Sequence, residues 1–193
     1  MNNPPAVPDK RYLPGDFAIW IFIFAELLVF GIFFLSYAFA RANNVALFNE
    51  HQLLLDRESG AINTVILITS SYFVVRAVNA IRDNAAAACA RWLGLAVLAG
   101  ACFIGIKLQE FGAKYEAGIS LSTNSFFMFY LSLTFFHFMH VLMGMVILAA
   151  VGVKAWRGGY SAGNHTGVET GASYWHMVDL VWIVLFPLVY LMR

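Results

Sequence analysis

The sequence predicts an all-α membrane protein, a bundle of five transmembrane helices. Its 193 residues are 61% hydrophobic and only 12% charged, and the mean hydropathy is +0.72. A soluble domain is typically about 45–50% apolar and about 25% charged, so this chain has too few charged side chains to cover itself with a water-exposed surface. The net charge of +1 provides no basic field that would attract nucleic acid, so no nucleic-acid partner is expected.

Five apolar segments are long enough to cross a bilayer. Each is close to the ~20 residues that a spanning helix needs, and about twice the ~9–11 residues of a barrel strand. A helix also satisfies its own backbone hydrogen bonds inside the membrane. The first segment contains Glu26 and no small-residue cleavage site follows it, so it is interpreted as a span and not as a signal peptide. The predicted spans are residues 17–40, 61–82, 92–111, 126–153 and 174–192.

The segments outside the spans indicate one membrane domain with a short tail. Residues 1–16, MNNPPAVPDKRYLPGD, are polar and broken by prolines, so a cytoplasmic tail is expected there, followed by a single domain over residues 17–193. Residues 42–60 form the longest outer loop, and their apolar side chains predict that it lies on the membrane surface. Residues 157–173 are rich in glycine and are predicted to be a loop.

The distribution of basic residues predicts the orientation. Seven of the twelve lysines and arginines fall on the side of the N-terminus, and the two short loops on that side hold Arg82, Arg91, Lys154 and Arg157. Basic residues concentrate in cytoplasmic loops. We therefore expect the N-terminus in the cytoplasm and the C-terminus in the periplasm.

Polar residues inside the spans are the candidate functional residues, because each is costly in hydrocarbon and must face protein or water. The simplest explanation for each is a hydrogen bond between helices. Within the third span, Lys107, Glu110 and Lys114 follow a spacing that places them on one helix face, which predicts a ladder of ion pairs. The intramembrane polar residues are Glu26, Asn63, Thr64, Ser70, Ser71, Arg76, Lys107, Gln109, Glu110, His137, His140, His176 and Asp179.

The two histidines of the fourth span raise the question of a haem or metal site. A haem between helices needs two axial ligands that face each other at equal depth. His137 and His140 project from one face of a single helix, whereas His176 lies ~20 Å nearer the cytoplasmic surface than His137. A metal needs three or four convergent ligands, and the sequence has no Cys-x-x-Cys-His motif or histidine-rich tract. No haem, metal or other cofactor is therefore predicted in this chain.

Glu26 is a better partner for these histidines. It lies nine residues into its span, ~14 Å from the cytoplasmic surface, and His140 lies ~18 Å from the same surface. A carboxyl group and an imidazole at similar depth can satisfy each other, so we predict a hydrogen bond between Glu26 and a histidine of the fourth span, with His140 as the first choice.

Several segments together resemble subunit III of the haem-copper oxidases. The segments IWIFIFAELLVFGIFF, INTVILITSS, KLQEFGAK, SFFMFYLSLTFFHFMHVLMG and YWHMVDLVWIVLFPLVYL follow the order and spacing of that family. The most specific elements are His-x-x-His-Val-x-x-Gly at 137–144, Tyr-Trp-His-x-Val-Asp-x-Val-Trp at 174–182 and Lys-x-x-Glu-Phe-x-x-Lys at 107–114. Many members have seven helices, and this chain lacks the first two. The start LPGDFAIWIFIFAELLVF is most similar to the five-helix form associated with nitric oxide reductase, NorE.

The resemblance implies a non-catalytic accessory subunit in the bacterial inner membrane, without catalytic residues of its own. Its partner would be the catalytic membrane subunit, which holds the haems, and phospholipid is expected to bind as well. The polar residues would then serve packing, lipid binding and assembly, and three tryptophans would contact the catalytic subunit. The first set is Glu26, His137, His140, Lys107, Glu110, His176 and Asp179, and the second is Trp20, Trp175 and Trp182.

The sequence leaves four functions open. The start of the chain favours a nitric oxide reductase complex, and the alternative is subunit III of a bacterial cytochrome c or quinol terminal oxidase. A haem-bearing membrane cytochrome and a small transporter are the remaining two. Only Pro187 interrupts a span, whereas a transporter built from broken helices would show matched interruptions in its two halves.

Overall fold

The computed structural model describes residues 14–192, and its spans are helical as predicted. Five helical segments within these residues are long and apolar enough to cross a membrane, and the last of them runs from α6 into a π-helical turn, η1. The predicted fold class, a polytopic helical membrane protein, is thereby confirmed. The elements are α1 (Phe17–Asn43), α2 (Val45–Gln52), α3 (Arg57–Arg82), α4 (Ala86–Glu116), α5 (Ser125–Trp156), α6 (Thr166–Phe186) and η1 (Pro187–Leu191).

Polar side chains define where three of the spans begin. The Asp16 carboxylate accepts a hydrogen bond from the amide of Ala18 at the start of α1. Asp56 accepts from two amides at the start of α3, and Asn124 accepts from the amide of Phe127 at the start of α5. The first amides of a helix have no partner within the helix, so these side chains satisfy them.

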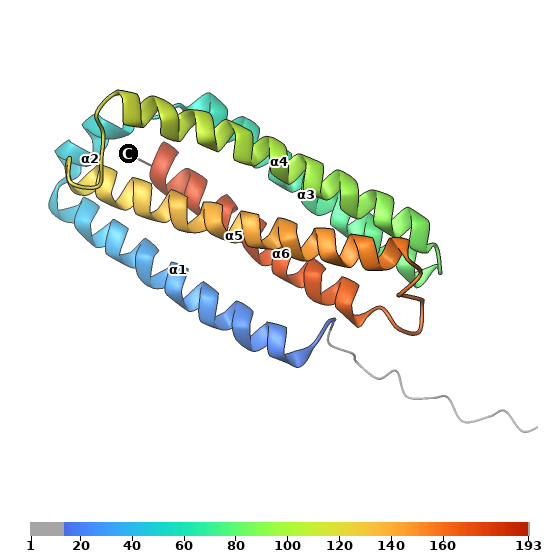
Figure 1. Cartoon of the computed structure of the whole chain (residues 1–193). Helices are drawn as coiled ribbons and strands as arrows, with labels where there is room; N and C mark the ends of the chain where they lie inside the picture. Colours follow the sequence, from blue (N-terminus) through green and yellow to red (C-terminus); the bar gives the residue numbers. More distant parts are fainter. Residues whose placement is uncertain (1–13, 193) are drawn as a thin grey trace, which may run out of the picture.

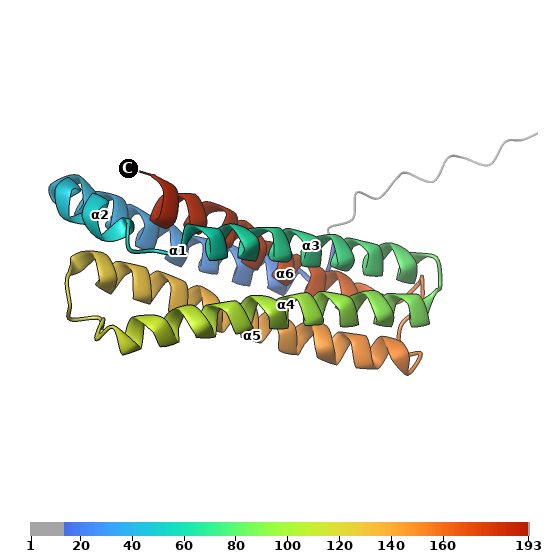
Figure 2. The ribbon, with the colours of Figure 1, turned by 90° about the horizontal axis from the view of Figure 1, so that it is seen from above.

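Four of the spanning helices form the core of the bundle. In chain order, α3 packs against α4, α4 against α5 and α5 against α6, and α6 returns to α3. Helix α1 lies outside this group, against α6 and α5, as Figures 1 and 2 show. In the most apolar stretch of each span, 61% of the residues are buried in α6 but only 11% in α1. Helix α6 is therefore the centre of the protein, and α1 is its periphery.

Within the described residues, the start of α1 and the end of η1 lie at opposite ends of the bundle. Helix α1 begins at the end where α3 and α5 finish, and η1 ends at the other (Figure 1). An odd number of spans requires this arrangement. Which end faces the cytoplasm remains the prediction made from the basic residues.

The fifth span begins earlier than predicted, because α6 starts at Thr166 and not near residue 174. The second half of the glycine-rich segment is therefore helix, and its prediction as a loop was wrong. At Gly167, an added Cβ atom would overlap the hydroxyl oxygen of Tyr160, so glycine serves close packing there and not chain flexibility. The third span is also longer than the predicted 92–111.

The segment predicted as a surface loop between the first two spans contains the short helix α2. Its Phe48 is 1% exposed and packs edge-on against Tyr37 of α1 and Phe126 of α5. The side-chain amide of Gln52 donates a hydrogen bond of 2.9 Å to the carbonyl of Val189 in η1. Helix α2 thus closes one end of the bundle and joins three other elements.

Two of the three tryptophans predicted to contact another subunit lie in the core. Trp175 and Trp182 are both 0% exposed. Trp175 packs over Gly144, where an added Cβ atom would come within 2.7 Å of the indole ring. The indole N–H of Trp182 donates to the Thr64 hydroxyl at 2.9 Å. Neither side chain can reach a partner, so this assignment was wrong for both; Trp20 is partly exposed and its assignment stays a prediction.

Candidate functional site

The predicted contact between Glu26 and His140 is present. Oε2 of Glu26 on α1 lies 3.1 Å from Nε2 of His140 on α5. The side chains are 20% and 8% exposed, so the pair lies at the edge of the bundle, where α1 meets α5. The His140 ring is held edge-on by Phe30 and Phe136, with centroid distances of 5.2 and 4.8 Å.

The tautomer of His140 follows from its second nitrogen. Nδ1 lies 2.8 Å from the carbonyl oxygen of Phe136, which can only accept a hydrogen bond, so Nδ1 carries a proton. Nε2 therefore accepts a hydrogen bond from a protonated Glu26 or, as part of an imidazolium, donates one to the carboxylate. In either case one hydrogen bond links the two side chains, and this bond joins the peripheral helix α1 to the core helix α5.

His137 lies on the same helix as His140 but bonds to α6 and not to α1. Its Nε2 donates to the carbonyl of Val178 on α6 at 3.0 Å. The ring is buried between Phe103 and Trp182, with centroid distances of 5.7 and 5.2 Å. Nδ1 of His137 is buried with no hydrogen-bond partner in the described part of the chain. The two histidines therefore connect α5 to α6 and to α1 separately.

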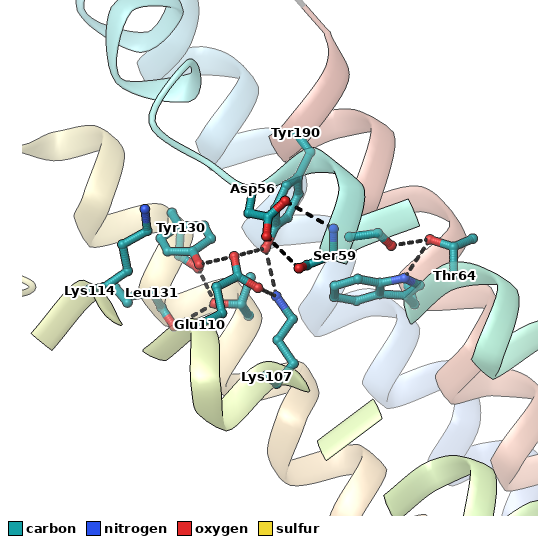
Figure 3. A network of polar contacts seen from close by, with 12 residues as sticks. Asp56, Ser59, Thr64, Lys107, Glu110, Lys114, Tyr130, Leu131 and Tyr190 are labelled. Carbon is teal, nitrogen blue, oxygen red and sulfur yellow. Dashed lines mark hydrogen bonds and ion pairs between the residues drawn. The ribbon is translucent and has the colours of Figure 1, made fainter. Parts of the chain in front are cut away.

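A second polar cluster, the Lys107 network, joins α4 to the C-terminal element η1, and Figure 3 shows its side chains from close by. Oε2 of Glu110 accepts from the ammonium of Lys107 at 2.7 Å. Its Oε1 accepts from the hydroxyls of Tyr130 and Tyr190 at 2.6 and 2.8 Å. Lys107 also donates to the Tyr190 hydroxyl at 2.7 Å, and its ammonium lies 4.9 Å from the ring centroid of Trp182. The network ties α4 to α5 and to η1.

Lys114 does not belong to this network, so the predicted three-membered ladder is reduced to one ion pair. Its ammonium donates to the carbonyl of Leu54 at 2.7 Å, and Figure 3 draws no contact between Lys114 and Glu110. One helical turn further along α4, the side chain has reached the end of the bundle and meets the segment after α2. Sequence reasoning also missed Tyr130 and Tyr190; the available signal was that a tyrosine within a span needs a partner for its hydroxyl.

A third polar group lies at the end where α1 begins. Nδ1 of His176 lies 2.5 Å from the Ser71 hydroxyl of α3 and 3.7 Å from the Asp179 carboxylate. Nearby, Glu169 is 2% exposed and pairs with Arg82 of α3 at 2.7 Å. Glu169 also accepts from the amide of Gly15 at 3.1 Å, and this contact attaches the start of α1 to α6. Glu169 was not predicted, because its segment was taken for a loop.

These contacts show what the polar residues can do chemically. The residues of the predicted polar network each contact a neighbouring helix or their own, whereas the buried side-chain amide of Asn63 and the indole N–H of Trp175 have no hydrogen-bond partner within residues 14–192. Within the same residues, no three His, Cys, Asp or Glu side chains gather in a way that could hold a metal ion. The Ser71 hydroxyl and the Asp179 carboxylate both face Nδ1 of His176, so these three side chains do not form a Ser-His-Asp triad, in which the two ring nitrogens contact different partners. The arrangement joins helices. Its geometry is that of a structural membrane subunit.

Comparison with known proteins agrees with this geometry. Residues 15–193 match the family model for cytochrome c oxidase subunit III. The chain belongs to the cytochrome c oxidase subunit III family. It is 35% identical over 189 residues to cytochrome c oxidase subunit 3 of Synechocystis sp., an alignment that covers 96% of this chain and 77% of that protein.

Of two further relatives, one is named as a subunit of a ubiquinol oxidase and the other as a subunit of a cytochrome c oxidase. The chain is 28% identical to subunit 3 of the cytochrome bo(3) ubiquinol oxidase of Pseudomonas aeruginosa, over 91% of this chain and 84% of the relative. It is 27% identical to cytochrome c oxidase subunit 3 of Bacillus subtilis, over 97% and 92%. The resemblance stated from the motifs is confirmed at the level of the family. A protein of this family is a non-catalytic, multi-pass subunit, and these bacterial relatives and the five spans place it in the bacterial inner membrane.

Proposed function

We propose that this chain is the accessory subunit III of a bacterial terminal oxidase. It binds the haem-bearing catalytic membrane subunit and supports that subunit's assembly, stability or sustained turnover. The observation that carries the proposal is the match to subunit III over residues 15–193, together with relatives that are all named as oxidase subunits. They favour a terminal oxidase over the nitric oxide reductase that the start of the sequence favoured.

The interior of the bundle supports an accessory role. In the Lys107 network, the Glu110 carboxylate accepts three hydrogen bonds and the Lys107 ammonium is 0% exposed, so these polar groups are bonded to each other and not to water. A buried polar network whose members are all satisfied makes a structure rigid and specific. This chain therefore offers its partner a stiff helical surface.

The decisive experiment compares the purified oxidase complex with and without this chain. We expect the complex lacking it to keep its haems and to consume oxygen, but more slowly or with faster inactivation during turnover. Complete loss of oxygen consumption, with the catalytic subunit intact and fully loaded with haem, would show that this chain takes part in the chemistry and would contradict the proposal.

A nitric oxide reductase is the second candidate partner. The observation in its favour is the Pro-Gly-Asp sequence before α1 together with Glu26 inside it, which resembles NorE. Isolation of the chain in mild detergent, with identification of the co-purifying catalytic subunit, distinguishes the two. A co-purifying nitric oxide reductase would replace the terminal oxidase in the proposal and keep the accessory role.

Two simple measurements test the remaining alternatives. The chain purified alone is expected to show no Soret band and no stoichiometric iron, copper or zinc, and a stoichiometric haem would make it a membrane cytochrome. Vesicles that contain only this chain are expected to show no solute flux, which a transporter would produce.

The proposed orientation has its own test. A reporter that is active only outside the cytoplasm should work when fused after Arg193 and fail when fused before Met1, because basic residues concentrate at the end where α1 begins. The reverse pattern would overturn the orientation and leave the family unchanged.

A further inference from the structure

Arg76 on α3 is an intramembrane basic residue outside the polar clusters described for the interior. Its guanidinium donates a hydrogen bond of 2.9 Å to the Tyr72 hydroxyl on the same helix. It also lies over the ring of Trp92 on α4, 4.9 Å from the centroid. Tyr72 is 52% exposed, and the half-buried Trp92 packs against Phe73 with a centroid distance of 5.7 Å. Aromatic rings therefore hold Arg76 on the outer face of the bundle, where α3 packs against α4.

The positive charge of Arg76 has no counter-ion within residues 14–192. The ion pairs of that part of the chain involve two other basic side chains and three histidines, and Arg76 takes part in none of them. A guanidinium has five N–H donors, and the bond to Tyr72 uses one of them. The remaining donors form a planar fork that matches the two oxygens of a carboxylate.

The guanidinium lies within the hydrocarbon region and not at its surface. Arg76 is six residues from Arg82, where α3 ends, which is about 9 Å along the helix axis. Helix α3 has 26 residues and is about 39 Å long, so about 4–5 Å of it project beyond each side of a hydrocarbon core of about 30 Å. The Arg76 side chain turns toward Tyr72, one turn further from that surface, because helical side chains point toward the N-terminus of their helix. In this conformation a lipid phosphate is out of its reach.

An unpaired charge at this depth requires a partner from outside the described chain. A charged side chain in hydrocarbon is costly and pairs with an opposite charge. The same protein pairs Lys107 with Glu110 at 2.7 Å. Tryptophan, tyrosine and arginine are also the residue types that are most enriched at the energetic centres of protein interfaces. The cluster of Arg76, Tyr72 and Trp92 therefore fits an acidic side chain on a neighbouring transmembrane helix.

We propose that the face of α3 and α4 around Arg76 binds the catalytic membrane subunit, and that Arg76 pairs there with an aspartate or glutamate within a span of that subunit. Both oxygens of the carboxylate accept hydrogen bonds from the guanidinium. The rings of Tyr72 and Trp92 surround the pair and keep lipid and water away from it. The partner is the catalytic subunit of the proposed function, on which this inference rests.

Photo-crosslinking in the intact membrane complex tests the surface. A benzophenone amino acid replaces Thr69 or Leu95, which are both exposed. Thr69 lies seven residues before Arg76 on α3, and Leu95 lies three residues after Trp92 on α4. We expect a link from each position to the catalytic subunit, on a helix that carries an acidic residue. The same group at Val146, which is 68% exposed on α5, should give no such link.

The two ways of failing are distinguishable. A purified complex that contains both subunits but gives no link from Thr69 and Leu95 would overturn this inference and leave the proposed function intact. A chain that purifies without any catalytic oxidoreductase subunit would contradict the proposed function, and the inference would fall with it.

Removal of the guanidinium tests the charge pair. Arg76→Gln should weaken binding of the chain to the purified catalytic subunit about 30-fold in mild detergent, because it leaves a buried carboxylate of the partner unpaired. Arg76→Lys keeps the charge and should lose less. Arg157→Gln is the matched control, since it removes the same charge at the same end of the bundle, from the exposed residue after α5, and should bind like the wild type.

Two further readouts separate this contact from a structural role and from lipid. The isolated Arg76→Gln chain should unfold like the wild type, because Arg76 has no counter-ion among residues 14–192 to lose. Equal binding of the wild type and Arg76→Gln would overturn the pair. A loss of bound anionic phospholipid in Arg76→Gln, seen by native mass spectrometry with unchanged subunit binding, would identify lipid as the partner and overturn it as well.

Discussion

Glu26 and Glu110 are both carboxylates within spans, and they lie in contrasting surroundings. Glu110 is 8% exposed and accepts hydrogen bonds from Lys107, Tyr130 and Tyr190. The Glu26 side chain is 20% exposed and has one partner, His140. Glu110 belongs to the core helices, whereas Glu26 belongs to the peripheral helix α1.

The two carboxylates therefore have different structural roles: one holds the core helices together, and the other attaches a peripheral helix. Three donors around Glu110 fix its position, and the removal of Lys107 leaves Oε2 of the carboxylate without a partner. Glu26 has one hydrogen-bonding partner among the described residues, the His140 imidazole, and lies at the edge of the bundle. We infer that Glu110 is needed for the fold, and that Glu26 contributes a weaker attachment of α1 and tolerates change.

The largest effect is expected for Glu110→Leu. It leaves the Lys107 ammonium buried without a counter-ion, and breaking one partner of a buried pair costs about 3–5 kcal/mol. Unfolding of the purified chain in mixed detergent micelles measures the loss. The double variant Lys107→Met/Glu110→Leu should recover much of the stability, because an apolar pair needs no compensating charge. A double variant as unstable as Glu110→Leu would show that the network contributes by shape and not by charge.

A smaller loss is expected for Glu26→Leu. It removes the partner of Nε2 of His140, and an unsatisfied buried polar group costs about 1–3 kcal/mol. The same unfolding measurement applies, with Leu28→Ala on the outer face of α1 as a control, since Leu28 is 66% exposed. A loss as large as that of Glu110→Leu would remove the proposed distinction between the two carboxylates.

Asp56 extends the comparison to a carboxylate outside the spans. Hydrogen bonds from the Ser59 hydroxyl and amide hold the pKa of Asp56 below its ordinary value of 3.8. Because the folded-state pKa is the lower one, the stabilisation is present above the ordinary value and is lost as the pH falls through the folded-state pKa. Asp56→Ala should cost about 1 kcal/mol at neutral pH through loss of the helix cap.

Asp56→Asn keeps the cap and cannot titrate. It should therefore unfold like the wild type at neutral pH and lose less stability than the wild type as the pH falls below about 4, the ordinary carboxyl pKa. An identical acid profile for the two proteins would assign the pH dependence to other carboxylates.

The smallest effect is expected for Glu26→Gln. The amide keeps a hydrogen bond to Nε2 of His140, and measured hydrogen bonds within membranes average only about 0.6 kcal/mol. Unfolding in micelles should show a change of this size or less. A loss equal to that of Glu26→Leu would mean that the charge of the carboxylate, and not its hydrogen bond, holds α1.

Some site contacts could be predicted from sequence because depth in a membrane can be counted along a helix. Glu26 and His140 were paired in this way, and the contact is present. The pairing of Lys107 with Glu110 also follows from spacing along one helix. The partners Tyr130 and Tyr190 could not be found by counting, since they come from α5 and η1, and their distances depend on how those elements pack.

The sequence by itself determined the number of spans, the family and the depth of each polar residue, because hydropathy and residue spacing are properties of a local segment. Only the tertiary structure decided which face of each apolar helix lies inward. Trp175 and Trp182 were placed on the outside and are buried. The physical reason is that lipid tails are as apolar as the protein core, so burial of an apolar side chain inside the bundle gains little over contact with lipid and leaves no periodic pattern in the sequence. Close packing, such as that of Trp175 on Gly144, decides the matter, and it exists only once the helices have met.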